Sequence, residues 1–301
     1  MKEKDRKILN KLIRDHEDVM GASRAAMLAI ESFIRSIQQL RCSIDQVQEL
    51  YLELAEAIKN TEPKVVPLIH LIEEFEKEIQ PFFSEDIEQV RNRAVEILTE
   101  KLEVLRTRVG QVIEKGLSFI NKGDVILVHT ASRDVINMLV MAREVFQKRF
   151  SVLVLKQDFV KTKQLIQALT QAGVDLTVIP EYNLSHCLDR ANKLFVGAVS
   201  ITRDQKVVTA IGTANIVGLC HLNQIPVYLF ATTLKISHQD SAEHRIHTKI
   251  EPMNHDDCAY RLTTHSHDLL DLHLVDVLVT EDGAIDKEKI ADYVQRFTKS
   301  I

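Results

Sequence analysis

The chain has 301 residues, 45% of them hydrophobic, and this length and apolar content suit two domains of ordinary size. A formal net charge of -5 without any Lys/Arg block excludes a general affinity for nucleic acid or for an anionic membrane. Four scattered cysteines, an N-terminus without a signal-peptide core and apolar runs far below the roughly 20 residues of a membrane span predict a cytoplasmic protein with reduced thiols.

Residues 1–120 are predicted to form a helical domain. Apolar residues recur at spacings of three and four in three segments, residues 24–40, 43–58 and 65–79. A longer periodic segment begins with a cap at Ser84 and extends as far as Ile120, which is about 50 Å of helix at 1.5 Å per residue. We expect so long a helix to connect two domains or to join an oligomer, with ordinary bundle packing as the alternative.

Residues 121–301 are predicted to form an α/β domain. Short apolar runs rich in β-branched residues predict six strands, at residues 125–129, 151–155, 175–179, 194–198, 226–231 and 276–280. Helical patterns separate most of them, at residues 133–147, 160–171, 184–191 and 214–223, and a last helix is expected over 286–299. This alternation predicts a Rossmann-like domain whose parallel sheet is covered on both faces. The sequence HTASRD follows the first strand in place of GxGxxG, so no dinucleotide site is predicted.

Residues 232–273 show little periodicity, and so long an irregular connection is usually functional or an interaction arm. The segment contains seven of the twelve histidines. A zinc interpretation would use residues from the set His244, His247, Asp256, Asp257, Cys258, His265 and His267. Their spacings fit no standard zinc site, and solvated histidines on a polar arm explain them, so neither a metal nor a cofactor is predicted.

Three constellations are expected at the carboxyl edge of the parallel sheet, where α/β proteins bind ligands. The first follows the strand at 125–129, the second is the turn that opens the helix at 214–223, and the third is a lysine beyond the strand at 226–231. Together they favour a phosphorylated small molecule. The alternatives are ordinary helix caps, an ordinary turn and a solvated surface lysine. The phosphate-binding candidates are Arg24, Ser132, Arg133, Gly212, Thr213, Asn215 and Lys235.

These segments carry a family resemblance over residues 117–301. The motifs are GDVILVHTASRDVINML, VGAVSI, IGTANIVGLCHLNQIPVYL, LKIS and VDVLVTEDGAI, in that order. The chain resembles the alpha, beta and delta regulatory subunits of translation initiation factor 2B and their relatives, which include ribose-1,5-bisphosphate isomerase and methylthioribose-1-phosphate isomerase. The resemblance implies a helical N-terminal domain, a Rossmann-like C-terminal domain of the ribose-phosphate isomerase/CoA-transferase-like kind, and self-association through the latter.

The sequence departs from the isomerase branch at both catalytic positions. The cysteine expected after the first strand falls near Thr130 or Ala131, and the aspartate of a VGAD segment is replaced by Val199. Neither a threonine hydroxyl nor valine can transfer a proton near neutral pH. An Asn-Lys pair that relatives often place before Ile-Gly-Thr is Thr209-Ala210 here, so part of the phosphate clamp is missing.

Nearby titratable groups are His129, Asp134 and Asp204. We expect the His129 ring to support the helix behind it and Asp204 to lie in a hairpin turn rather than to act as acid or base. The preferred interpretation is a non-catalytic regulatory protein that senses a phosphorylated sugar or nucleoside monophosphate and binds protein partners through its helical domain. The alternative is a sugar-phosphate aldose-ketose isomerase, similar to ribose-1,5-bisphosphate isomerase, with rearranged catalytic residues.

Overall fold

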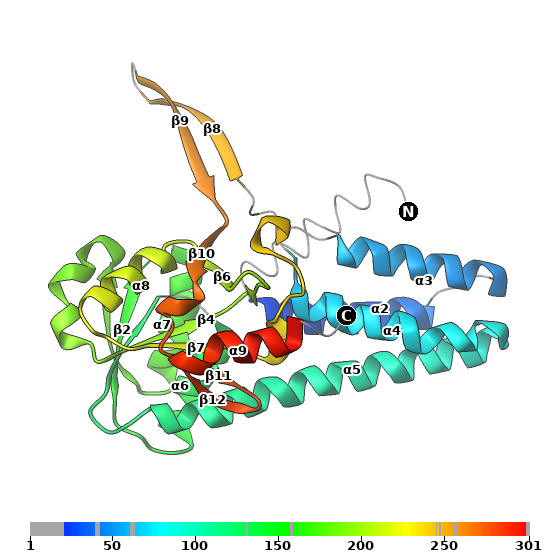
Figure 1. The fold of residues 1–301 in the computed structure, drawn as a ribbon, viewed down its shortest axis with the longest axis horizontal. Helices are drawn as coiled ribbons and strands as arrows, with labels where there is room; N and C mark the ends of the chain where they lie inside the picture. The colour runs from blue at the N-terminus through cyan, green and yellow to red at the C-terminus, as the bar shows by residue number, and fades with distance from the viewer. Residues whose placement is uncertain are drawn as a thin grey trace.

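A seven-stranded sheet lies at the centre of the sheet-containing half of the molecule (Figure 1). The computed structural model describes residues 21–39, 43–60, 64–129, 132–156, 159–244, 246, 248–255 and 258–298. The sheet strands are β1 (Val125–Val128), β2 (Ser151–Lys156), β3 (Asp175–Pro180), β4 (Lys193–Gly197), β7 (Val227–Phe230), β11 (Val277–Thr280) and β12 (Gly283–Asp286). Their order is β12-β11-β7-β4-β1-β2-β3, and all neighbours are parallel except the edge pair β11–β12. The six predicted strands and the Rossmann-like fold are confirmed.

A second, antiparallel sheet has the order β10-β6-β5, formed by β5 (Ser200–Ile201), β6 (Lys206–Ala210) and β10 (His267–Asp271). Between β7 and β10 the chain forms a hairpin of β8 (Thr248–His255) and β9 (Cys258–His265), which extends away from the body (Figure 1). The prediction of an irregular connection over residues 232–273 is therefore wrong. All eight residues of β9 are exposed, so both faces of the hairpin meet solvent and the sequence has no need to alternate apolar with polar residues.

The helices are α2 (Ala22–Gln39), α3 (Ile44–Lys59), α4 (Val66–Ile79), α5 (Ile87–Gly116), α6 (Arg133–Glu144), α7 (Phe159–Gln171), α8 (Thr213–Leu222) and α9 (Lys287–Thr298). The shorter 3-10 helices are η1 (Gln80–Ser84), η2 (Leu117–Phe119), η3 (Glu181–His186), η4 (Leu188–Arg190), η5 (Thr233–Lys235), η6 (Ser241–His244) and η7 (Leu272–Leu274). No helix among the described residues combines the length and the apolar content needed to span a membrane.

Two helix predictions need correction. The segment 184–191 forms η3 and η4 rather than an α-helix. The long helix starts after Asp86, whose carboxylate accepts hydrogen bonds from the backbone N–H groups of Glu88 and Gln89 at 3.0 and 3.1 Å, whereas Ser84 belongs to η1. An aspartate at this position satisfies two N–H groups that have no partner within the helix and also favours the positive helix end.

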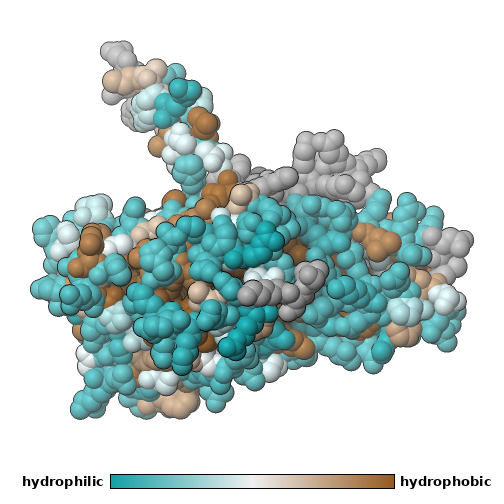
Figure 2. Space-filling model, viewed as in Figure 1, coloured by the Kyte–Doolittle hydropathy of each residue, from teal (hydrophilic) through white to brown (hydrophobic). Residues whose placement is uncertain are grey.

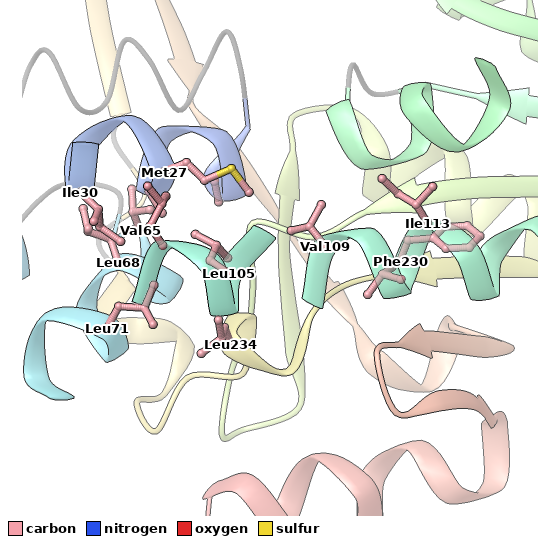
Figure 3. Packing of buried hydrophobic residues seen from close by; sticks show 14 of the residues in the cluster. Met27, Ile30, Val65, Leu68, Leu71, Leu105, Val109, Ile113, Phe230 and Leu234 are labelled. Carbon is pink, nitrogen blue, oxygen red and sulfur yellow. The ribbon is translucent and has the colours of Figure 1, made fainter. Parts of the chain in front are cut away.

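The helix α5 connects the helical region to the sheet. It packs against α2 and α4 near its beginning and against α6 and β11 near its end. One buried hydrophobic cluster follows it throughout, from residues of α2 and α4 to Phe230 of β7 (Figure 3). A second cluster of buried hydrophobic residues lies on the other face of the sheet. Because the first cluster is continuous across residue 120, the division into domains 1–120 and 121–301 stays a prediction.

Candidate functional site

The carboxyl ends of three adjacent strands, β7, β4 and β1, form the edge at which the sequence places its candidate site. His129 follows β1 directly, and Lys235 ends η5, the short helix after β7. Gly212 does not follow a strand of the parallel sheet. The strand before it, β6, belongs to the antiparallel sheet.

His129 is buried and makes two contacts at this edge. Its Nδ1 lies 3.1 Å from Oγ1 of Thr213, and its Nε2 lies 3.3 Å from Oε2 of Glu181. The hydrogen bond with His129 lowers the pKa of Glu181, which makes that carboxylate a weaker base. Since both ring nitrogens have partners within the chain and Thr213 is the first residue of α8, the geometry agrees with the expected supporting role of His129.

Gly212 is the N-cap residue of α8 and has a φ of 88°. Side chains rarely adopt this left-handed region, and a Cβ atom at this position would lie 2.5 Å from Oε1 of Glu181 and 3.2 Å from Cε1 of His129. The backbone conformation therefore requires glycine, and a Cβ atom would in addition displace the carboxylate end of the Glu181 side chain.

We expect Gly212→Val to lower the free energy of unfolding by at least about 1–3 kcal/mol, because a β-branched residue is strained at this φ and its Cβ displaces Glu181. Chemical denaturation of both proteins measures the difference. Gly218→Val is the matched control, because Gly218 lies in the same helix, has no positive φ, and a Cβ there meets nothing within 4 Å. Equal stability of Gly212→Val and the parent would contradict the left-handed conformation of Gly212.

Lys235 is not a solvated surface residue, and that alternative is wrong. Its side chain is 3% exposed, and its Nζ lies 3.3 Å from Oδ2 of Asp134 in the first turn of α6. The same oxygen accepts a hydrogen bond from Oγ of Ser23 in α2 at 3.2 Å. A buried ion pair of two residues from the sheet region thus lies at the ligand edge, and one residue of the helical region, Ser23, is hydrogen-bonded to it.

Two further carboxylates complete the edge. Asp268 of β10 accepts a hydrogen bond from the backbone N–H of Ala214 at 3.0 Å, so it occupies one donor at the start of α8. Glu281, after β11, accepts a hydrogen bond from the backbone N–H of Thr233 at 2.8 Å, while Arg108 of α5 donates to Oγ1 of Thr233 at 3.0 Å. The sequence does not predict a place at this edge for Ser23, Glu181, Asp268 or Glu281. No local signal identifies them, since each partner lies 48 or more residues away in the chain.

The remaining phosphate candidates differ in their surroundings. Ser132 is the N-cap of α6 and Arg133 its first residue, and both are half-buried. Arg133 forms no ion pair with any other described residue. Arg24 and Asn215 are exposed, on α2 and α8 respectively. The structure therefore brings Arg133 and Lys235 to one edge and shows no contact that ties Arg24 or Asn215 to them.

The positions that correspond to the isomerase residues do not supply a proton carrier. Val199 is half-buried and packs against the first hydrophobic cluster, and Thr130 and Ala131 lie outside the described residues. Asp204 lies in the turn between β5 and β6, as predicted, where it accepts a hydrogen bond from the backbone N–H of Ser241 at 2.9 Å.

The histidines of residues 232–273 are not uniformly solvated. His244 is 1% exposed and His267 is 6% exposed, so the explanation by solvent exposure is wrong for both. The other zinc candidates His247, Asp256 and Asp257 lie outside the described residues. Within the described part of the chain, no group of three or more possible ligands is arranged to hold a metal ion.

Comparison with known proteins finds similarity to initiation factor subunits and to an isomerase. The chain is 29% identical, over 73% of its length and 75% of the relative, to a putative translation initiation factor eIF-2B subunit 2-like protein of Pyrococcus horikoshii. It is 24% identical to ribose 1,5-bisphosphate isomerase of Archaeoglobus fulgidus, over 90% of its length and 87% of the relative.

Solved structures share the fold. A crystal structure of the Pyrococcus horikoshii OT3 translation initiation factor eIF-2B superposes with a TM-score of 0.77 at 23% identity, covering 95% of this chain and 98% of that chain. The tetrameric eIF2B-beta2-delta2 complex from C. thermophilum contains a chain that superposes with a TM-score of 0.71 at 16% identity, covering 99% of this chain and 94% of that chain. The family model of the initiation factor 2 subunit family matches residues 18–287. The chain therefore belongs to the initiation factor 2 subunit family.

Proposed function

We propose that this chain is a non-catalytic regulatory protein of the eIF2B alpha/beta/delta type, which senses a phosphorylated sugar at the carboxyl edge of its sheet. The observation that carries the proposal is the pairing of the ionisable groups at this edge. His129 pairs with Glu181 and Lys235 with Asp134, all within the chain. An acid or base that acts on a substrate must have its reacting atom available within hydrogen-bond reach, and these groups are already engaged with each other.

Of the features at this edge, the His129–Glu181 pair most resembles a catalytic acid–base pair. Its geometry nevertheless argues against the isomerase alternative on two grounds. The His129 side chain is 0% exposed, and the lowered pKa of Glu181 leaves a carboxylate that is poorly matched to proton abstraction near neutral pH. Val199 offers no titratable group at the position where the isomerases resembled by this chain carry an aspartate.

We expect no aldose-to-ketose conversion of ribose 1,5-bisphosphate or of related sugar phosphates above the protein-free rate. Proton NMR of the reaction mixture, with the archaeal isomerase as positive control, measures this directly. Product formation that is abolished by His129→Gln would overturn the non-catalytic assignment and would identify His129 as part of a rearranged catalytic pair.

A phosphate group has two cations to approach at this edge. Arg133 is half-buried, stands in the first turn of α6 and makes no ion pair within the described residues. Lys235 is paired with Asp134, but a phosphate dianion carries more charge than one carboxylate and can compete for the ammonium group. The N-terminal end of α6 adds backbone N–H donors to the same region.

We expect a selective rise in the thermal unfolding midpoint when the chain meets the correct member of a panel of sugar monophosphates, sugar bisphosphates, nucleoside monophosphates and GDP. A ligand at 100 times its Kd stabilises by about 2.7 kcal/mol. Lys235→Ala should weaken binding by about 1.5–3 kcal/mol, because a charge-assisted hydrogen bond is lost. Ligand-induced shifts are compared within each protein, since the variant starts from a different stability.

Lys115→Ala is the control for charge, because Lys115 is exposed near the end of α5. If Lys235→Ala keeps the full ligand-induced rise in unfolding midpoint, Lys235 does not contact the ligand. A panel without any active compound would contradict sugar-phosphate sensing and leave protein partners as the ligands of the chain. For those partners we propose binding through the helical region, in the cytoplasm, together with self-association through the sheet region.

A further inference from the structure

A pocket of about 370 Å³ lies at the amino edge of the parallel sheet, where β1 and β2 begin. Its walls are the two turns that precede these strands, one at residues 120–122 and the other at residues 147–149. The two strands are parallel neighbours, so both turns meet at the same end of the sheet. The six residues of β2 separate this end from the carboxyl edge by about 20 Å, so the pocket is separate from the candidate site.

Hydrogen bonds hold the two turns together. The Lys148 Nζ donates to the backbone carbonyl groups of Leu117 and Ile120 at 2.6 and 2.8 Å, at the end of η2. The backbone N–H of Gly123 donates to the carbonyl of Arg149 at 2.8 Å. The walls of the pocket are thus fixed before any ligand arrives, and a pre-organised site loses less conformational entropy when it binds.

The pocket is positively charged. Lys122, Lys148 and Arg149 line it, and Lys122 and Arg149 are exposed. None of the three forms an ion pair with a residue that the structure describes. The buried carboxylate of Asp124, two residues after Lys122, pairs with Lys193 instead, at 2.6 Å. In a chain whose net charge is -5, three cations without a counter-charge make a local site that attracts anions.

Exposed apolar side chains stand directly beside the pocket. Val145 and Phe146 follow the last residue of α6 and are 66% and 53% exposed, and Met141, one helical turn earlier, is 37% exposed. Most of the molecular face in Figure 2 is hydrophilic, and its hydrophobic residues gather in separate patches. Single exposed apolar residues are ordinary, whereas adjacent ones rimmed by charged residues are typical of a protein-interaction surface.

The end of α6 fixes these apolar side chains relative to the pocket. The backbone N–H of Lys148 donates to the carbonyl of Ala142 at 3.0 Å, and Gln147 adopts a left-handed φ of 50°. Glycine is the usual residue at this position of a helix end, and strained residues of other types gather at functional sites. The Gln147 side chain donates to the carbonyl of Glu144 at 2.7 Å, which closes the turn. We call Lys122, Val145, Phe146, Lys148 and Arg149 the amino-edge surface.

Both parts of the amino-edge surface restrict what can bind. An Arg guanidinium pairs with a carboxylate through two parallel hydrogen bonds, and a Lys ammonium acts as a mobile positive charge. A small anion would leave Val145 and Phe146 in water. A nucleic acid would meet only the three cations of this surface, and the net charge of -5 would oppose its approach. A peptide segment with carboxylates beside a bulky apolar side chain satisfies both parts.

We propose that the amino-edge surface binds an acidic segment of a partner protein. Carboxylates of that segment enter the pocket and pair with Lys122, Lys148 and Arg149, while an adjacent Leu, Ile, Val or Phe covers Val145 and Phe146. The proposal goes beyond the proposed function, because this surface lies at the opposite edge of the sheet from the proposed sugar-phosphate site and outside the helical region.

Selection from a display library of short random peptides on the immobilised full chain supplies the probe. We expect the enriched peptides to carry several Asp or Glu residues next to a Leu, Ile, Val or Phe. Fluorescence anisotropy of the enriched peptides then measures their Kd. Enrichment of peptides without acidic residues, or of no peptide at all, would overturn the proposal.

Lys122→Glu and Arg149→Glu should each weaken peptide binding by at least about 10-fold, because each replaces an attraction by a repulsion. Lys289→Glu is the matched control for charge, because Lys289 is exposed on α9 and does not line the pocket. All three positions are exposed, so the variants should keep the unfolding midpoint of the parent. Equal peptide binding by the parent and both pocket variants would place the peptide elsewhere and overturn the proposal.

Phe146→Ser tests the apolar part of the surface. It should weaken peptide binding by about 10-fold and leave the salt dependence of the Kd unchanged, whereas the two pocket variants should make that dependence shallower. Tyr182→Ser is the control, because Tyr182 is an aromatic residue that is 85% exposed in η3, after the carboxyl end of β3. An unchanged Kd for Phe146→Ser would contradict the apolar contact and with it the proposal.

A single-stranded RNA of mixed sequence, measured in the same way, distinguishes an acidic peptide from a nucleic acid. It should bind at least about 10-fold more weakly than the selected peptides. Tighter binding of the RNA than of the peptides, with loss in Arg149→Glu, would overturn the choice of a protein segment. None of these outcomes affects the thermal shift that depends on Lys235, because the variants leave the carboxyl edge unchanged.

Discussion

Asp134→Asn is expected to lower the free energy of unfolding by about 3–5 kcal/mol, because it leaves the Lys235 ammonium buried without a counter-charge. The asparagine oxygen can still accept the hydrogen bond from Ser23, so the loss reports the charge rather than the hydrogen bond. Chemical denaturation of the parent and the variant in the same buffer measures the difference.

Two controls isolate the buried pair. Asp134→Asn combined with Lys235→Met removes both charges and should recover most of the lost stability, since a buried ion pair contributes little more than apolar residues of similar volume. Asp240→Asn removes one partner of the exposed Arg203–Asp240 pair and should change little. A single variant as stable as the parent would show that Lys235 finds another partner or solvent in solution.

The Asp134→Asn variant also tests whether a ligand binds at Lys235. If a sugar phosphate reaches Lys235, it replaces the missing carboxylate, and its stabilising effect should be larger on Asp134→Asn than on the parent. A smaller effect would indicate that the phosphate binds elsewhere, because removing a competing carboxylate can only favour an anion at Lys235.

The second large effect is a dependence of stability on pH that arises at His244. Burial lowers the pKa of His244 from 6.5 to about 4, with a smaller contribution from Lys64 and opposing contributions from Asp204 and Glu243. Its Nδ1 lies 3.3 Å from Oγ of Ser200, and its buried Nε2 has no hydrogen-bond partner among the described residues. The ring is therefore held neutral in the folded chain.

The sign follows from the lowered pKa. Between pH 6.5 and 4 the unfolded chain binds a proton at this histidine that the folded chain does not, so stability is complete above pH 6.5 and falls as the pH drops toward 4. The loss from this one group is on the order of 3 kcal/mol. Denaturant unfolding at several pH values between 7 and 4 should show a shallower dependence for His244→Gln. His265→Gln is the control, because His265 is exposed on the β8–β9 hairpin, and it should leave the slope of stability against pH unchanged. An unaltered slope for His244→Gln would show that His244 is not the source of the pH dependence.

The six strands of the parallel sheet and the long helices were predictable because burial of one or both faces gives their sequences a regular pattern of apolar residues. The strand β1 (Val125–Val128) is fully apolar since both faces of the parallel sheet are covered, and α5 shows a clear helical period since one face packs along its whole length. The β8–β9 hairpin was not predictable for the converse reason. Neither face of β9 is buried, so no pattern marks it as a strand.

The candidate site was predictable only in part. The polar residues that directly follow strands, such as His129 and Lys235, could be placed at one edge because parallel strands share a direction. Their partners could not, since Ser23 is 111 residues from Asp134 and Lys235 is 101 residues from it. The sequence therefore predicted Lys235 as a phosphate candidate, with a solvated side chain as the alternative, but it did not predict the buried ion pair with Asp134.

The helix α5 has a mechanical consequence. Its 30 residues form a rod of about 45 Å that is embedded in a continuous core at both ends. A rod of this length acts as a lever, since a tilt of about 5° at the sheet displaces the opposite end by about 4 Å. Arg108, on this rod, donates to Thr233 in the segment that follows β7. A rearrangement of that segment that tilted the whole rod would therefore produce a larger displacement at the far end of the helical region than at the sheet.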